Sequence, residues 1–173
     1  MDIKCVKVGY LECNCYVLIK NNKALVIDPG SEANKIFKLI GDNQLLGIII
    51  THYHFDHIGA LDDIKEKYNV NVYDRYNMIE GDNSIGNFDF EVIYTPGHKE
   101  DLITLYFKEY NCMFVGDFIF KDSIGRCDLA GGNMDDMNKS ICKIKKYKND
   151  TILYPGHGDK TTLGYEKKNN VYF

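Results

Sequence analysis

Short apolar segments follow one another along the chain in two periodicities. Runs of alternating or consecutive apolar residues predict strands, and these lie at residues 3–8, 15–19, 24–27, 45–50, 70–74, 88–94, 102–107, 112–115 and 151–154. Apolar positions three or four residues apart predict a helix at 31–40, a second over 58–68, and a third that begins near Met134 and ends at Tyr147. Ser31 is the expected N-cap of the first helix. Short strands that alternate with helices predict a layered structure of both types.

The domain organisation follows from length and composition. The chain has 173 residues, of which 45% are hydrophobic and 27% charged, and this amount of apolar sequence suits one compact core. No Pro- or Ser-rich linker, repeat or low-complexity segment interrupts it. We therefore expect a single domain spanning residues 1–173.

Charge and cysteine content narrow the possible partners and the compartment. The net charge is -4, which provides no basic surface for nucleic acid or an anionic membrane. The start of the chain lacks a signal peptide, and no apolar run is long enough to cross a bilayer, so we expect a soluble, cytoplasmic protein. The six cysteines are then expected to be free thiols, and Cys13 and Cys15 lie in an alternating run that reads as a buried strand.

The five histidines occupy special positions. Four apolar segments each lead into a side chain that can bind a metal ion, and these side chains are His52, His98, Asp117 and His157. Strand ends converge at one edge of a sheet assembly, which predicts a shared site there. Glycines precede the last three, at Gly97, Gly116 and Gly156, and permit a tight turn just before each one.

The segment after the fourth predicted strand carries a dense cluster, His52-Tyr53-His54-Phe55-Asp56-His57. In an extended segment His52 and His54 point to the same side, whereas Asp56 and His57 enter a helical turn and can face a second ion. Imidazole and carboxylate ligands without thiolate suit zinc, and also iron or manganese, in an open catalytic site. The sequence thus predicts two divalent metal ions, most simply zinc.

Two further residues have open interpretations. Arg126 is one of two arginines, and its planar guanidinium suits a substrate carboxylate; an ion pair with Asp122 or Asp128 that orders the loop is the equal alternative. Asp28 is expected to order the histidine segment from behind by hydrogen bonds, or else to serve only in an Asp28-Pro29-Gly30 turn.

Taken in order, these residues resemble the metallo-β-lactamase-fold superfamily, and within it the small glyoxalase II-like (hydroxyacylglutathione hydrolase-like) enzymes. The match rests on Asp28-Pro29-Gly30, Thr51–Gly59, Thr95–His98, Gly116-Asp117, Ser123–Arg126 with Asp128, Tyr154–Gly158 and Thr161–Glu166. The resemblance implies an α+β fold, a four-layer αββα sandwich, here without the C-terminal helical domain of full-length glyoxalase II. One departure is Lys99-Glu100-Asp101, where the family commonly has Thr and small residues, and this affects the pocket wall beside His98.

The same resemblance implies the ligand sets and the reaction. His52, His54 and His98 would hold the first metal, Asp56, His57 and His157 the second, and Asp117 would bridge them. Asp56 and Asp117 would act with a metal-bound hydroxide that attacks an acyl thioester carbonyl. Two dications, two carboxylates and one hydroxide leave a net positive charge, which favours a small anionic substrate.

Two other functions remain open from the sequence. One is a mononuclear iron persulfide dioxygenase of the same fold, although such enzymes typically leave the second site incomplete. The other is a metal-binding or redox partner module. Neither needs the full set of seven ligands that this chain contains.

Overall fold

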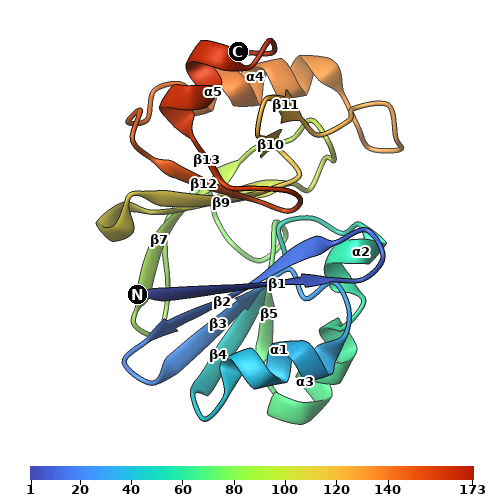
Figure 1. Cartoon of the computed structure of the whole chain (residues 1–173), viewed down its shortest axis with the longest axis vertical. Coiled ribbons are helices and arrows are strands. Elements are labelled where there is room, and N and C mark those ends of the chain that lie inside the picture. Colours follow the sequence, from blue (N-terminus) through green and yellow to red (C-terminus); the bar gives the residue numbers. More distant parts are fainter.

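The computed structural model describes residues 1–173 as four layers, two facing sheets with helices on both outer sides (Figure 1). The first sheet has the strand order β1 (Asp2–Val8), β2 (Cys13–Lys20), β3 (Lys23–Ile27), β4 (Gln44–Ile49) and β5 (Asn71–Tyr73). The second has the order β13 (Thr161–Thr162), β12 (Ile152–Pro155), β9 (Cys112–Gly116), β8 (Ile103–Phe107), β7 (Phe88–Tyr94) and β6 (Gly81–Ile85). The predicted α+β sandwich is confirmed.

Both sheets are mixed. In the first sheet β1, β2 and β3 are antiparallel neighbours, while β4 and β5 join in parallel. In the second sheet only the β9–β12 pair is parallel. A separate hairpin is formed by β10 (Ile119–Phe120) and β11 (Ser123–Ile124), and a 3-10 turn covers Lys108–Tyr110. The parallel pairs matter for function because β4, β9 and β12 lead into site residues at one edge.

The helices cover the outer faces of the sheets. The first sheet carries α1 (Ala33–Ile40), α2 (Phe55–Ile58) and α3 (Leu61–Tyr68), and the second carries α4 (Met134–Ile144) and α5 (Leu163–Asn169) (Figure 1). Each helix falls short of the length and apolar character that a membrane crossing requires.

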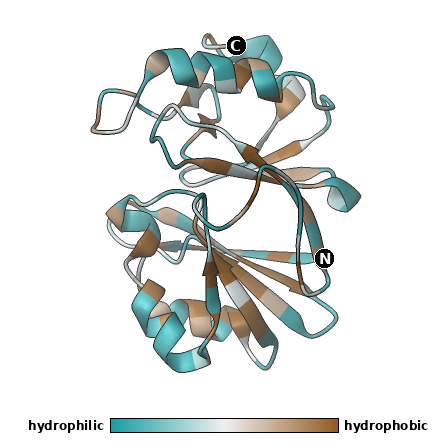
Figure 2. Cartoon of the chain, turned by 180° about the vertical axis from the view of Figure 1, so that it is seen from behind, coloured by the Kyte–Doolittle hydropathy of each residue, from teal (hydrophilic) through white to brown (hydrophobic).

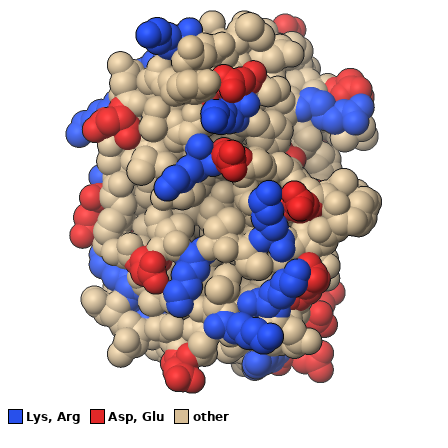
Figure 3. Space-filling model, viewed as in Figure 1, with Lys and Arg blue, Asp and Glu red and all other residues tan.

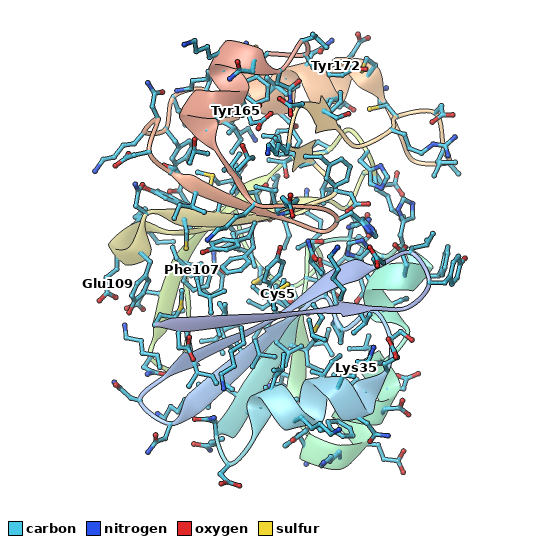
Figure 4. All side chains as sticks on the ribbon, in the orientation of Figure 1. Cys5, Lys35, Phe107, Glu109, Tyr165 and Tyr172 are labelled. Carbon is cyan, nitrogen blue, oxygen red and sulfur yellow. The ribbon has the colours of Figure 1, made fainter.

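Strand alternation divides the apolar side chains among three cores. Leu18 of β2 faces the space between the sheets, whereas its neighbour Val17 faces the helices of the first sheet. Phe107, labelled in Figure 4, belongs to the core between the sheets, and Met137 of α4 belongs to the third core outside the second sheet. The hydrophobic strands and polar outer helix faces are visible in Figure 2.

All nine predicted strands are present, with ends within two residues of the prediction, but the helices need corrections. Ser31 does not cap α1; the N-cap is Glu32, whose side chain accepts from Gly9 N–H at 3.0 Å instead. The predicted helix over 58–68 is two helices, because Ala60 N–H donates to Pro29 O at 2.9 Å rather than within the helix. The helix predicted to end at Tyr147 ends at Ile144.

Candidate metal centre

The five histidines, Asp56 and Asp117 come together where strands of both sheets end. His52 follows β4 by three residues, His98 follows β7, and Asp117 follows β9 directly. His157 follows β12, which runs parallel to β9, so Asp117 and His157 emerge side by side. The first half of the chain thus contributes one dense segment, and the second half contributes one ligand-type residue from each of three loops.

His52, His54 and His98 form the first group. The Nδ1 atom of His54 lies 3.1 Å from His52 Nε2 and 2.8 Å from His98 Nε2. His54 is extended, with φ -81° and ψ 146°, as the same-side placement of His52 and His54 requires. Three imidazole nitrogens that point at one another have a spacing suited to a common cation.

Asp56, His57 and His157 form the second group. Asp56 Oδ2 lies 3.1 Å from His157 Nε2 and 3.8 Å from His57 Nε2. Asp56 and His57 belong to α2, the short helix that follows the extended His52–His54 segment. The backbone changes from extended to helical between the two groups, as the sequence predicted, but the His57 ring stays close to His52, at 4.2 Å between centroids, and His52, His57 and Asp117 form a further set of close ligand atoms.

Asp117 lies between the two groups. One carboxylate oxygen, Oδ1, is 3.3 Å from His57 Nε2, and the other, Oδ2, is 3.6 Å from both His98 Nε2 and His157 Nε2. Its carboxylate therefore faces members of both sets at once. This is the placement expected of a residue that bridges two ions.

Hydrogen bonds on the far side of the rings fix their orientation. His98 Nδ1 donates to Arg126 O at 2.7 Å and His157 Nδ1 donates to Leu11 O at 3.0 Å, since a carbonyl can only accept. Each bond places the ring proton on Nδ1 and leaves the Nε2 lone pair for the site. These two carbonyl partners have no signal in the sequence.

Asp28 supports the histidine segment as predicted. Its Oδ1 accepts Thr51 N–H at 2.8 Å, and its Oδ2 accepts the Thr51 hydroxyl at 2.7 Å and His57 Nδ1 at 3.0 Å. Asp28 is 2% exposed as a residue, so these partners compensate the burial of its carboxylate. Asp28 does not face the site itself.

The charges of the site favour a cation. Burial and the neighbouring imidazoles lower the pKa of His52 well below its ordinary value, so that ring is neutral and able to act as a ligand. Burial acts in the same direction at His57, but the Asp28 and Asp117 carboxylates outweigh it and raise the pKa of His57 well above its ordinary value. The carboxylates around His57 thus attract positive charge to this position.

Two buried polar atoms test whether metal ions fit. His57 Nε2 and Asp117 Oδ1 are both inaccessible, face each other at 3.3 Å, and have no hydrogen-bond partner. Buried polar atoms are almost always paired, and an unpaired donor-acceptor couple of this kind is explained by a cation bound between them. The residues present therefore fit a metal centre.

Arg126 and Lys99 each form an ion pair with a nearby aspartate. The Arg126 guanidinium makes a bidentate pair with Asp128, in which Nε donates to Oδ1 and Nη2 donates to Oδ2, both at 2.7 Å. This pair lowers the pKa of Asp128 to about 2. This pair is the loop-ordering alternative for Arg126. Its backbone carbonyl, and not its guanidinium, is the group bonded to a ligand-type residue, His98. The Lys99 ammonium lies 3.4 Å from Asp101 Oδ1. Asp101 Oδ2 accepts Tyr53 N–H at 3.0 Å and so supports the histidine segment, a role that was not predicted from the sequence.

Among relatives of known sequence, the "Probable metallo-hydrolase YqgX" of Bacillus subtilis is 34% identical over 95% of this chain and 94% of its own. The "Hydroxyacylglutathione hydrolase GloC" of Haemophilus influenzae is 29% identical over 99% of this chain and 98% of its own. This chain is therefore similar over nearly its full length to two proteins whose names denote hydrolases.

Two crystal structures are closely similar. The BLEG-1 B3 metallo-beta-lactamase superposes with a TM-score of 0.94 at 30% identity, covering 99% of both chains. TTHA1623 in a di-iron-bound form gives a TM-score of 0.91 at 29% identity, covering 98% of this chain and 100% of its own. The family model of the metallo-beta-lactamase superfamily matches residues 8–76 and 79–157. The chain belongs to the metallo-beta-lactamase superfamily.

Proposed function

We propose that this protein is a hydrolase that binds two divalent metal ions and cleaves acyl thioesters. The observation that carries the proposal is the position of Asp117, whose two carboxylate oxygens face His57 on one side and His98 and His157 on the other. A carboxylate between two ligand groups suits a two-metal centre better than a single ion. The di-iron form of TTHA1623 supports two ions, and the likeness to GloC supports a thioester.

The proposed division of the ligands is the one that the family resemblance implies. His52, His54 and His98 would hold one ion, Asp56, His57 and His157 the other, and Asp117 both. Two divalent ions held there supply an activated water as nucleophile and a Lewis acid for the carbonyl oxygen. Zinc fits these nitrogen and oxygen donors, as do iron and manganese.

The chain's own residues provide orientation and charge balance. The Nδ1 bonds of His57, His98 and His157 keep each Nε2 directed at the site. Asp56 and Asp117 offset part of the charge of the two ions and leave an excess of positive charge, which favours an anionic substrate. No side chain is required as the nucleophile.

An apolar rim beside Asp56 offers room for an acyl or carrier group. Tyr10 and Phe55 are 82% and 62% exposed, and their rings stack at 6.4 Å between centroids. With Leu11 they border a hollow of about 190 Å³ that Asp56 also lines. The rim is the part of the site that a nonpolar portion of the substrate would contact.

The proposal is tested with purified protein loaded with zinc, iron or manganese and assayed on S-D-lactoylglutathione and other acyl thioesters. We expect metal-dependent turnover that Asp117→Ala reduces by at least about a hundredfold, since it removes a group held between both ions. Asp150→Ala, an exposed aspartate, is the control and should retain full activity.

Four results would contradict the proposal. A loaded protein that turns over no thioester, or a fully active Asp117→Ala variant, would remove its basis. Hydrolysis of a β-lactam in place of thioesters would favour the activity named for BLEG-1. Elemental analysis gives the fourth, because two ions per chain are expected, and one iron alone would favour the dioxygenase alternative.

A further inference from the structure

A sulfur atom lies beside the second group of ligands. Cys13, the first residue of β2, is 0% exposed. Its Sγ and one ligand atom each of His57 and His157 all lie within 4.8 Å of one another. Cys13 is thus a third potential donor around the same space, from a strand that the ligand prediction did not include.

The neighbours of Cys13 point into the same space. His57 is 0% exposed and its Nε2 atom has no hydrogen-bond partner, and the same is true of Asp117 Oδ1, 3.3 Å away. Gly30 permits the approach, because a Cβ there would lie 3.2 Å from Cys13 Cβ and would also overlap the Asp56 carbonyl. The start of β2 and the metal-binding segment therefore pack directly against each other.

The position of Cys13 is distinct from that of the other buried thiol on the strand. Cys15 lies on the same face of β2 and is also 0% exposed, yet it belongs to no group of potential ligands. Burial alone therefore does not explain why Cys13 adjoins two histidines. The pair provides a matched comparison between a thiol near ligands and a thiol in the core.

We propose that Cys13 is a sulfur ligand of the second metal ion, added to Asp56, His57, His157 and Asp117. The inference rests on the two-metal site of the proposed function. As the metal–sulfur bond forms, the thiol releases its proton to solvent, and no oxidation or reduction takes place. Thiolate is a soft donor, so this site should favour zinc, cadmium or cobalt over manganese or magnesium.

The test is the absorption spectrum of the full chain loaded with cobalt(II). A cobalt–thiolate bond gives an intense charge-transfer band in the near ultraviolet, which histidine and carboxylate ligands do not produce. We expect the band in the wild-type protein and in Cys15→Ala, and its loss in Cys13→Ala. The second zinc ion should also bind at least about tenfold more weakly to Cys13→Ala, with a smaller change for manganese.

The outcomes separate this inference from the proposed function. A wild-type cobalt protein without the band, or a band that persists in Cys13→Ala, overturns the role of Cys13 whatever the protein hydrolyses. A band that depends on Cys13 supports it even in a protein without thioesterase activity. If Cys13→Ala does not fold, Cys13→Ser preserves the size of the side chain, and the wild-type spectrum alone can still refute the proposal.

Discussion

At the scale of single residues, Asp28 connects backbone geometry to metal binding. It adopts φ 51°, a left-handed conformation that aspartate tolerates better than most residues. This geometry lets one buried carboxylate reach both Thr51 and His57. The orientation of His57 therefore depends on a residue about thirty positions earlier in the chain.

Asp28→Asn should weaken metal binding by about ten- to a hundredfold, because the neutral amide is a poorer acceptor for His57 Nδ1 and leaves the ring a less basic and less firmly oriented ligand. A competition titration with a coloured chelator measures the affinity, and circular dichroism verifies the fold. Asp89→Asn, at an exposed position, serves as the control. Equal affinities for wild-type protein and Asp28→Asn would show that His57 needs no partner.

The seven residues proposed as ligands could be selected from the sequence because their types and spacing are visible in it, and the structure brings them close together. The sequence also predicted that Cys13 is buried. It could not indicate that Cys13 adjoins His57 and His157, since that neighbour relation arises from packing between β2, α2 and a loop more than a hundred residues later. The carbonyl partners of His98 and His157 are hidden for the same reason, because every residue has a carbonyl.

At the scale of elements, β2 holds the loop that carries His157. Asn14 N–H donates to Gly156 O at 2.7 Å, and its side-chain amide donates to Pro155 O and Gly158 O at 3.0 and 2.9 Å. Tyr16 adds a hydroxyl bond of 2.6 Å to Pro155 O. β2, an interior strand of the first sheet, thus fixes a loop of the second sheet that carries His157.

Asn14→Ala should destabilise the protein by about 1–3 kcal/mol, because it removes the two side-chain hydrogen bonds to Pro155 O and Gly158 O and leaves only the Tyr16 hydroxyl on Pro155 O. It should also weaken the second metal ion more than the first, since only His157 depends on this loop. Urea unfolding and stepwise metal titration measure the two effects. A uniform loss of both ions, or none, would contradict the role assigned to Asn14.

The elements that the sequence did not predict have physical reasons for being hidden. β6 contains Gly81, Asp82, Asn83 and Ser84, which favour turns, and it is a strand because it pairs with β7. β10, β11 and β13 have two residues each, too few for a periodic pattern. α5 was not predicted because one of its buried residues is Glu166, which breaks the apolar pattern that identifies helices. The Glu166 carboxylate accepts from Asp122 N–H at 3.0 Å and from Asn170 Nδ2 at 2.9 Å.

At the scale of the whole molecule, the metal centre lies across the junction of the two sheets. One half of the chain supplies His52, His54, Asp56 and His57, and the other supplies His98, Asp117 and His157. The four layers were expected from the resemblance of the motifs rather than from periodicity. On the face shown in Figure 3, acidic and basic groups are interspersed.

Removal of the metal ions should lower the melting temperature of the whole protein. An ion present at a hundred times its dissociation constant stabilises the folded state by about 2.7 kcal/mol, which corresponds to roughly 5–10 °C for a chain of this size. Thermal unfolding with and without a chelator measures the shift, and added zinc should reverse it. Identical melting curves would show that no ion links the halves.

The division of the ligands between halves also affects when the site can form during synthesis. His52 and His157 are 105 positions apart, so a growing chain exposes the dense histidine segment long before it contains the last ligand. The first group is complete once residue 98 has been made, whereas the second waits for residue 157. Tight loading is therefore an event of the finished fold, and a ribosome-bound intermediate should hold at most one ion, weakly.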